Sequence, residues 1–367
     1  MPDPLLTTPL HTEHVRLGGR MVPFAGWEMP IQFGGGILAE ARAVRSGAGL
    51  FDVSHMARLR VSGGDARALL DWTHTADIGE AMPAGRARYG LFCNERGGII
   101  DDGIVYRLGE TDFLAVANAA NAAKVRAWLE RWRAERFPAA SLDDLTVHVA
   151  MIALQGPRAM EMVAAATESA PPPRPFRLAE MQVGGVPAWV ARTGYTGEDG
   201  VEMMPRAEDA AALWRMFAEA GSEPCGLGAR DVLRLEAGLL LHGSDMDESV
   251  NPIEAGLERF VHLGSDFCGA EVVRRAAEQG AQRRLTGFKT RQRGAVPRAH
   301  SPLLADGERV GEATSGGYSP TLDTTIGLGY LPARFGAPGA PIQVDVRGKL
   351  IEAETVALPF YTRSRSN

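Results

Sequence analysis

The sequence predicts an α+β fold of two or three domains, in which helices cover an antiparallel sheet and an all-β module forms the C-terminus. The chain has 367 residues, more than one hydrophobic core usually holds. Strand-like and helical segments alternate without the long crossovers that parallel strands need. After residue 278 the helical patterns stop, and short strand-like runs follow at turn-rich intervals. Such runs are typical of a barrel or a sandwich.

Individual elements follow from the spacing of apolar residues. Helices are expected over residues 36–45, 65–72, 119–136, 159–166, 207–220, 226–238 and 269–278. Strands are expected over residues 57–61, 86–92, 99–106, 112–118, 145–154, 186–192, 285–290, 309–314, 326–330, 341–346 and 351–357. The strand over 99–106 should pair with the one over 112–118. Residues 11–33 mix Gly, Pro and aromatic residues and predict an ordered loop with short strands.

Composition excludes several classes of protein. The net charge is −6 and no basic tract occurs, so a nucleic-acid partner is not expected. Cys93, Cys225 and Cys268 lie far apart, which predicts neither a disulfide framework nor a zinc site and suits a reducing compartment. No signal peptide and no bilayer-spanning apolar run is visible. We therefore expect a cytoplasmic protein that binds no metal and no membrane.

Two adjacent carboxylates, Asp101 and Asp102, interrupt the apolar run over 99–106. Successive strand side chains point to opposite faces, so one carboxylate can face a cavity while the other bonds backbone or faces water. Burying a carboxylate without a partner is costly, so a strand that carries two needs a reason. The alternative is a strand end where both carboxylates meet solvent or cap a turn.

Other polar groups have simpler explanations. Asp52, Ser54 and His55 resemble a hydrolytic set, but triad residues usually come from separate elements, and capping of a turn is the better interpretation. Asn118 lies where a strand ends and a helix begins. It is either a helix cap or an amide that binds a ligand. Arg230 shares a helical face with Arg234, which favours a salt-bridged, solvated helix.

The sequence contains no motif that is typical of a phosphate-binding loop, a calcium loop or a zinc protease. The run GYTGEDG over 194–200 has the spacing GxxGxxG rather than GxGxxG, and no Walker A pattern occurs, so a phosphate-binding loop is not expected. The acids over 242–248 have no calcium-loop spacing, and no HExxH motif is found. This stretch is predicted to be a loop without a metal.

Several segments, taken in order, resemble the T protein of the glycine cleavage system, a tetrahydrofolate-dependent aminomethyltransferase. The segments are MVPFAGWEMP (21–30), FDVSHM (51–56), GGIIDDGIVY (97–106), LQGP (154–157), GYTGEDGVE (194–202), GLGARDVLRLEAG (226–238) and TSGGYSPTL (314–322). The resemblance covers nearly the whole chain.

The resemblance implies three domains arranged as a cloverleaf around a central folate channel. The first domain is discontinuous, over 1–50 and 140–265. An α+β domain over 51–139 is inserted in it and carries the catalytic carboxylate. A β-barrel-like domain of Greek-key or jelly-roll type covers 280–367.

The resemblance also implies the site. Asp101 corresponds to the catalytic carboxylate of the family, a choice that strand geometry leaves open. The family's folate contacts fall on Met56, Tyr89, Val116, Asn118, Tyr195, Glu202, Arg230 and Tyr361. Glu202 suits the paired N–H donors of a pterin, and Arg230 suits the acidic end of folate or a polar wall. Gly103 replaces a bulkier aliphatic residue, and the tail that carries Tyr361 is shorter than in some members.

The implied reaction moves the methylene carbon of an aminomethyl group from the lipoyl arm of H protein to tetrahydrofolate. Ammonia leaves, and 5,10-methylenetetrahydrofolate and dihydrolipoyl H protein form. The implied partners are thus lipoylated H protein and folate. The alternatives are a folate-dependent demethylase of the same fold and a folate-binding protein without turnover. The retained Asp101 and the absence of a KGCYxGQE-like motif argue against the last one.

Overall fold

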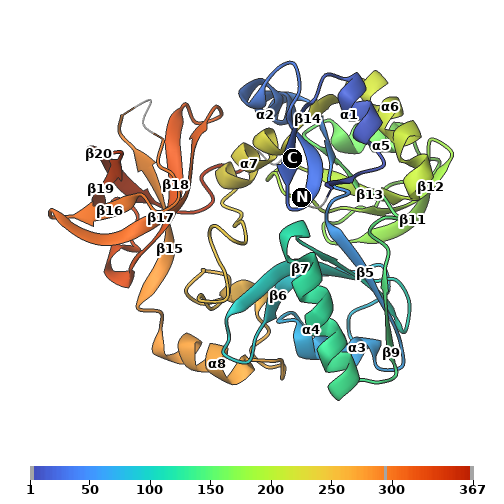
Figure 1. Ribbon diagram of the computed structural model, residues 1–367, viewed down its shortest axis with the longest axis horizontal. Helices are drawn as coiled ribbons and strands as arrows, with labels where there is room; N and C mark the ends of the chain where they lie inside the picture. The colour runs from blue at the N-terminus through green and yellow to red at the C-terminus, as the bar shows by residue number, and fades with distance from the viewer. Residues whose placement is uncertain (1–3, 293–295, 364–367) are drawn as a thin grey trace.

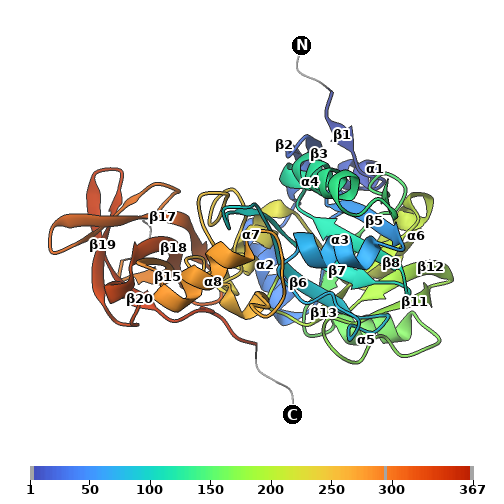
Figure 2. The same ribbon diagram turned by 90° about the horizontal axis from the view of Figure 1, so that it is seen from below.

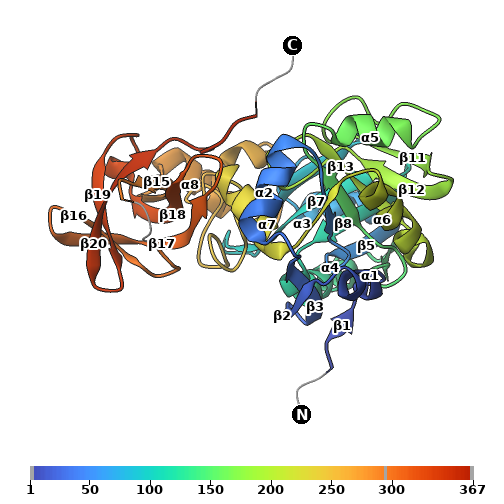
Figure 3. The same ribbon diagram turned by 90° about the horizontal axis from the view of Figure 1, so that it is seen from above.

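The computed structural model describes residues 4–292 and 296–363, and these form three lobes (Figure 1). Two lobes, each built on its own sheet, lie against each other. The third is a barrel at one end of the molecule. Figures 2 and 3 show that the barrel joins the other lobes through the region around helices α7 (Leu227–Glu236) and α8 (Ala270–Gln279).

The first lobe contains a six-stranded sheet. Its strands, in spatial order, are β11 (Leu178–Val183), β12 (Val186–Ala191), β13 (Gly200–Pro205), β10 (Ile152–Gln155), β4 (Gly49–Asp52) and β14 (Glu223–Cys225). All pairs are antiparallel except β14 with β4. Helices α5 (Ala159–Ala165) and α6 (Ala210–Glu219) supply core residues, among them the fully buried Trp214 and Phe217. The apolar residues on one face of α6 thus favour a helix and explain why this helix packs against the sheet.

Short elements complete this lobe. They are α1 (His11–Arg16), α2 (Ile37–Ser46) and the three-stranded sheet of β1 (Leu6–Thr7), β3 (Trp27–Gln32) and β2 (Arg20–Phe24).

The second lobe contains a five-stranded antiparallel sheet. Its strands, in spatial order, are β6 (Ala87–Cys93), β7 (Ile99–Arg107), β8 (Asp112–Ala117), β5 (Ala57–Gly63) and β9 (Ala140–Asp144). Helices α3 (Ala66–Thr73) and α4 (Ala122–Glu135) pack Leu69, Val125 and Leu129 into its core. The predicted pairing of β7 with β8 is confirmed.

The third lobe is a closed six-stranded barrel. Its strands, in order around the barrel, are β15 (Arg283–Thr290), β18 (Thr324–Pro332), β17 (Glu308–Ser319), β16 (Pro302–Ala305), β19 (Pro341–Val346) and β20 (Lys349–Val356). Its core is apolar, with Phe288, Leu303 and Val344 fully buried. The predicted α+β fold with a C-terminal barrel is confirmed.

Each predicted helix is found within three residues of its expected ends, and the largest differences are at the starts of α4 and α6, where a 3₁₀ turn precedes the α-helix. One predicted strand, over 145–154, is wrong: β9 ends at Asp144 and β10 begins at Ile152. Two interactions bend the chain between them. The Asp144 carboxylate accepts the backbone N–H of Thr146 (3.0 Å), and the buried Arg58 guanidinium binds the carbonyl oxygen of Thr146. Residues 11–33 also contain a helix, α1, that the sequence did not predict.

The predicted domain borders fall next to strands. Strand β4 continues to Asp52 in the first sheet, and β9 begins at Ala140 in the second. The division into 1–50 with 140–265, 51–139 and 280–367 stays a prediction.

A buried ion pair fastens α7 to the barrel. Arg234 Nη1 donates to Asp245 Oδ2 (2.6 Å), and the two side chains are 4% and 0% exposed. Arg234 Nη2 also donates to Ser315 Oγ (2.9 Å), and Thr314 Oγ1 donates to Asp245 Oδ1 (2.6 Å). The expectation of a solvated helix is therefore wrong for α7, because Arg234 is buried against partners from outside the helix.

We expect Asp245→Ala to lower the free energy of unfolding by about 3–5 kcal/mol, because Arg234 is left buried without its counter-charge. Urea unfolding measures the change. The matched control is Glu271→Ala, which breaks the exposed pair with Arg275 and should change stability by less than about 0.5 kcal/mol. Equal effects would mean that the buried pair does not hold the lobes together.

Candidate active site

A cavity of about 170 Å³ lies among the first two lobes and the segment that follows α7. Strands β6, β7 and β8 supply one wall, β13 and α7 supply another, and residues 238–240 and 257–260 close it. Apolar side chains such as Met56, Val116 and Leu240 cover much of the surface, and charged groups project between them. An apolar cavity with a few converging polar groups is the usual form of a small-molecule site.

The two adjacent carboxylates accept hydrogen bonds from the same side-chain amide. Asn118 Nδ2 donates to Asp101 Oδ1 and to Asp102 Oδ1, both at 2.8 Å. Asp102 lines the cavity and accepts the Tyr89 hydroxyl (3.0 Å). Asp101 is fully buried and accepts the backbone N–H of Asn118 (2.9 Å) and the Asn121 amide (2.6 Å). One carboxylate thus faces the cavity, and the other is held by the chain.

Strand register explains this arrangement. Gly103 on β7 pairs with Ala117, the last residue of β8. The two carboxylates therefore stand beyond the end of β8, where the chain turns into a short 3₁₀ helix over Ala119–Asn121. That turn carries Asn118 and Asn121 over the carboxylates.

Burial and the neighbouring charge of Asp102 raise the pKa of Asp101 to about 7. The amide donors of Asn118 and Asn121 oppose this rise. Burial also raises the pKa of Asp102, against the hydrogen bond from Tyr89. The pair can therefore hold or release a proton near neutral pH, which a general acid or base requires.

A histidine contacts Asn121, which binds one of the two carboxylates. His242 Nε2 lies 3.0 Å from the carbonyl oxygen of Ile99, and its Nδ1 lies 2.8 Å from Asn121 Nδ2. A neutral ring protonated at Nε2 satisfies both contacts, because the carbonyl accepts and the amide donates. The second amide hydrogen of Asn121 is then directed to Asp101. This chain of bonds fixes the orientation of Asn121.

A second polar cluster lies on β13 and α7. Glu202 accepts the Thr193 hydroxyl, and burial raises its pKa. Arg230 lies over the Tyr195 ring, 4.4 Å from its centre, and burial lowers its pKa. Within residues 4–292 and 296–363, the Arg230 side chain makes no hydrogen bond and no ion pair. The cavity thus holds a buried carboxyl group and a half-buried guanidinium group without a direct bond between them.

Two known domain families match most of the chain. The GCVT N-terminal domain matches residues 10–265, and the glycine cleavage T-protein C-terminal barrel domain matches residues 283–362. The aminomethyltransferases of Symbiobacterium thermophilum and Geobacillus kaustophilus are each 44% identical to this chain, over 98% of it and 98% and 100% of their own lengths. The chain belongs to the glycine cleavage T-protein family.

A solved structure of this family has the same fold. The glycine cleavage system aminomethyltransferase T of Bartonella henselae superposes with a TM-score of 0.90 at 36% identity, over 97% of this chain and 98% of that one. The activity that goes with membership of the T-protein family is aminomethyl transfer, so the protein is a transferase.

Most of the predicted folate contacts come together in this T-protein cavity. Those that line it are Met56, Tyr89, Val116, Asn118, Tyr195, Glu202 and Arg230. Their contact with folate stays a prediction, as does the catalytic role of Asp101, which lies one layer behind Asp102. Tyr361 is not among the lining residues: its hydroxyl donates to Glu198 (2.8 Å), and its ring lies under Arg45 (4.0 Å).

Sequence reasoning missed part of the lining, chiefly Ile104, Met151, Phe176, Thr193, Leu240, Leu257, Arg259 and Phe260. Thr193 could have been found, because it precedes the GYTGEDG run. Phe176 and Arg259 carry no local signal, since each lies in a connecting segment that tertiary packing brings to the cavity. Phe176 has φ of +56°, a strained value for a bulky residue.

The departure at Gly103 has a packing reason. A Cβ atom there would lie 2.5 Å from the carbonyl oxygen of Val116 and 3.1 Å from the Phe92 ring. The backbones of β7 and β8 thus approach too closely for a side chain in this protein. The glycine also leaves room at the cavity wall.

The set Asp52, Ser54 and His55 is not a triad. The Asp52 carboxylate accepts the backbone N–H of Ser54 (2.9 Å), as expected for a turn, and also bonds His14 Nε2 (2.8 Å). His55 is buried, and burial lowers its pKa to about 3.

Among the described residues, no group of three or more His, Cys, Asp or Glu residues could hold a metal ion. No described helix is long and apolar enough to cross a membrane.

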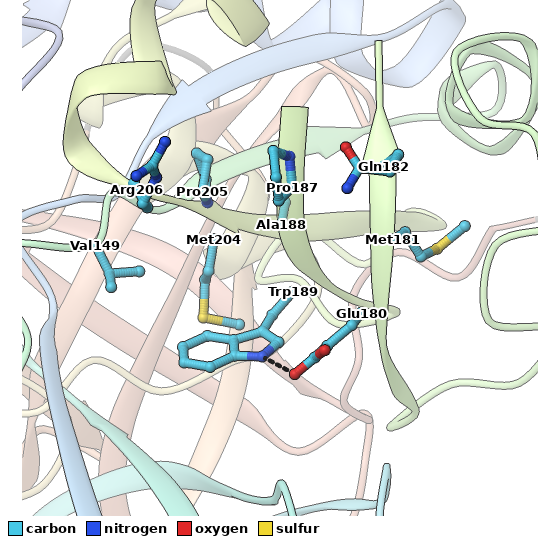
Figure 4. A pocket seen from close by; sticks show the side chains of 10 residues that line it. All are labelled: Val149, Glu180, Met181, Gln182, Pro187, Ala188, Trp189, Met204, Pro205 and Arg206. Atoms are coloured by element: carbon cyan, nitrogen blue, oxygen red, sulfur yellow. Dashed lines mark hydrogen bonds between the residues drawn. The ribbon is translucent and has the colours of Figure 1, made fainter. Parts of the chain in front are cut away.

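A hollow of about 330 Å³ over β11, β12 and β13 differs in chemistry (Figure 4). Its charged groups are already paired. Trp189 Nε1 donates to Glu180 Oε1 (3.1 Å) and Arg206 pairs with Asp209 (3.2 Å). Its charged side chains therefore already have partners, unlike Arg230 in the cavity.

We expect the raised pKa of Asp101 to make stability depend on pH. Between about pH 4 and pH 7 the folded protein keeps a proton on Asp101 that the unfolded chain has lost, so stability should fall as pH rises. Asp101→Asn should remove this part of the slope. Urea unfolding at several pH values measures it.

Asp102→Asn is the companion variant. Removing the neighbouring charge should lower the pKa of Asp101 and move the sloping region to lower pH. Parallel stability curves for the parent and both variants would contradict the raised pKa.

Proposed function

We propose that the cavity binds tetrahydrofolate and that the protein transfers to it the methylene carbon of an aminomethyl group carried on the lipoyl arm of an H protein. The products are 5,10-methylenetetrahydrofolate, ammonia and the dihydrolipoyl carrier. The observation that carries this proposal is the cavity itself. In one space it combines a buried acid, an arginine stacked on a tyrosine and a carboxylate pair that can hold a proton.

Glu202 is suited to the pterin. Its Oε2 accepts the Thr193 hydroxyl, and the Tyr106 hydroxyl also acts on this carboxylate. A carboxylate can accept several hydrogen bonds, and a ring with paired N–H donors would use the capacity that remains. Arg230, held over Tyr195, supplies a positive charge to the same cavity. We propose Met56, Val116 and Tyr195 as the apolar contacts of the bound ring.

Asp101 and Asp102 are the groups that handle protons. The reaction removes two N–H protons from the folate and delivers one to the departing ammonia and one to the sulfur. A carboxyl with a pKa near 7 can take and return such a proton. Asp102 stands at the cavity wall, and Asp101 shares the Asn118 amide with it. We propose that Asp101 provides the catalytic charge and that the pair acts as one unit.

The rest of the protein positions the reactants. Asn118 and Tyr89 fix the Asp102 carboxylate, so little reorganisation is needed when positive charge develops on the carbon that moves. Preorganised groups of this kind, in a space closed to water, are the main source of rate enhancement in many enzymes. A small-molecule demethylase would need the same folate groups but no carrier protein, so the carrier is what the experiment must vary.

The test is a single-turnover assay with aminomethylated H protein and tetrahydrofolate, in which ammonia and methylenetetrahydrofolate are measured. The proposal predicts equal amounts of both products. A free N-methylated amino acid serves as the alternative donor. Turnover with that donor and none with the loaded carrier would overturn the proposal in favour of a demethylase.

In this assay we expect Asp101→Asn to reduce turnover about a hundredfold or more, the scale seen when a group that stabilises transition-state charge is removed. The matched variant is Asp143→Asn, an exposed aspartate on β9, which should keep full activity. Asp102→Asn tests whether the two carboxylates act together. A loss confined to Asp102→Asn would move the catalytic role to the carboxylate at the wall.

We expect Glu202→Gln to weaken binding of tetrahydrofolate about tenfold, because the amide presents a donor where the pterin also donates, a mismatch of about 1–3 kcal/mol. Titration calorimetry measures the affinity, and thermal unfolding of the ligand-free variant checks that the fold is intact. Unchanged affinity would show that Glu202 has a structural role.

A further inference from the structure

Asn121 links a histidine to a buried carboxylate. It occupies the N-cap position of α4, where an asparagine side chain normally accepts a backbone N–H of the first helical turn. Within the described chain its side chain makes no such capping bond. The amide instead lies 2.6 Å from Asp101 Oδ1, to which it donates, and 2.8 Å from His242 Nδ1. The side chain of Asn121 is therefore committed to the site rather than to its helix.

His242 is held at both nitrogens of its ring. Nδ1 meets the Asn121 amide, and Nε2 lies 3.0 Å from the carbonyl oxygen of Ile99. The backbone around the ring is fastened to β7, because Ile99 N donates to the carbonyl oxygens of Asp247 (3.2 Å) and Val250 (3.1 Å). The histidine is only half-buried, so water can exchange protons with it. Histidine is also the side chain that changes charge most readily near neutral pH.

Several charged groups lie on the elements around His242. They are Asp101 and Asp102 of β7, Asp247 of the histidine's own segment, the pair Asp245–Arg234, the pair Glu248–Lys124 and Arg283 of β15. Burial raises the pKa of Asp102, and a positive charge on His242 opposes this rise. Attraction between opposite charges thus favours a protonated histidine beside ionised carboxylates.

Hydrogen-bond geometry imposes the opposite relation on Asp101. A protonated imidazole donates from both nitrogens, so the Nδ1–H of His242 would face an N–H of Asn121. Turning the amide over removes this clash, but the amide oxygen then faces Asp101 as well. An ionised carboxylate repels that oxygen, whereas a protonated carboxyl group can donate its O–H to it. The histidine and the carboxyl group can therefore be satisfied only when both are protonated or both are not.

We propose that His242 is a positioning residue that acts on Asp101 through the Asn121 amide and makes the two groups take up protons together. Neutral His242 directs the amide nitrogen to an ionised Asp101. When water supplies one proton to each group, the amide turns over and its oxygen holds the acid form of Asp101. The part of this inference that concerns turnover rests on the proposed function, and the part that concerns proton binding does not.

The first test follows the ring nitrogens of His242 in the ligand-free protein by nitrogen NMR at a series of pH values. The signal that is lost in His242→Gln identifies the residue. We expect the Nε2–H tautomer at high pH and a titration with a Hill coefficient of about 1.5 or more. In Asp101→Asn the coefficient should fall to about one, and His242 should take up its proton at higher pH, because no second proton is then needed. Attraction between charges alone predicts a shift to lower pH.

The second test measures turnover against pH in the single-turnover assay. His242→Gln keeps a donor and an acceptor but cannot take up a proton. We expect the acidic limb of its pH profile to move to lower pH and to have the slope of one proton, where the parent has a steeper slope. His242→Phe loses both hydrogen bonds and should be slower by about tenfold at every pH. The matched control is His148→Gln, an exposed histidine that does not line the cavity, which should keep the profile of the parent.

The outcomes separate this proposal from the proposed function. A Hill coefficient of about one in the parent, or a shift of His242 to lower pH in Asp101→Asn, would overturn the coupling and leave the proposed function standing. Equal pH profiles for the parent and His242→Gln would overturn its role in turnover. A parent that titrates as expected but forms no methylenetetrahydrofolate would overturn the proposed function and support the coupling alone.

Discussion

The amide of Asn118 is the contact on which the site depends. It holds two carboxylates from adjacent residues of one strand, which would otherwise point apart and repel each other. The alternation of strand side chains sends Asp102 to the cavity and leaves Asp101 fully buried. Because one amide binds both, a change in the charge of one is felt by the other. Burial raises the pKa of both carboxyl groups and the charge of Asp102 adds to the rise at Asp101, while the amide opposes it.

That contact exists because three parts of the chain meet. The register of β7 and β8 leaves the carboxylates beyond the end of β8, and the turn after β8 brings Asn118 and Asn121 over them. His242, from the segment after α7, fixes Asn121. The same segment contains Asp245, which is paired with Arg234 and bound to barrel strand β17 through Thr314. The barrel thus acts on the site indirectly, by holding the segment that supports the carboxylate pair.

The charges of the site are divided between two adjoining spaces. The buried acid Glu202 and the cavity-facing Asp102 line the cavity. Arg86 and Arg88 line the neighbouring groove, which shares Tyr89 and Phe260 with the cavity. Acidic and basic groups are thus kept apart within one region of the protein.

Much of this protein was determined by the sequence alone. Helical spacing predicted α4, α6 and α7 almost to their ends, and turn-rich intervals predicted the barrel. The motifs that carry the family resemblance predicted most of the cavity lining, including Met56, Asn118 and Glu202. These signals are local: an apolar stripe or a short motif keeps its meaning wherever the chain places it.

Tertiary structure alone decided the rest. Strand alternation separates Asp101 from Asp102 but does not say which one faces the cavity, since that depends on which face of the sheet the other lobe covers. The α7 arginines looked like surface residues until Asp245 and Tyr195 were brought to them from other elements. Phe176 and Arg259 enter the site from connecting segments that share no motif. Contacts between residues far apart in sequence are set by packing, and no local pattern encodes them.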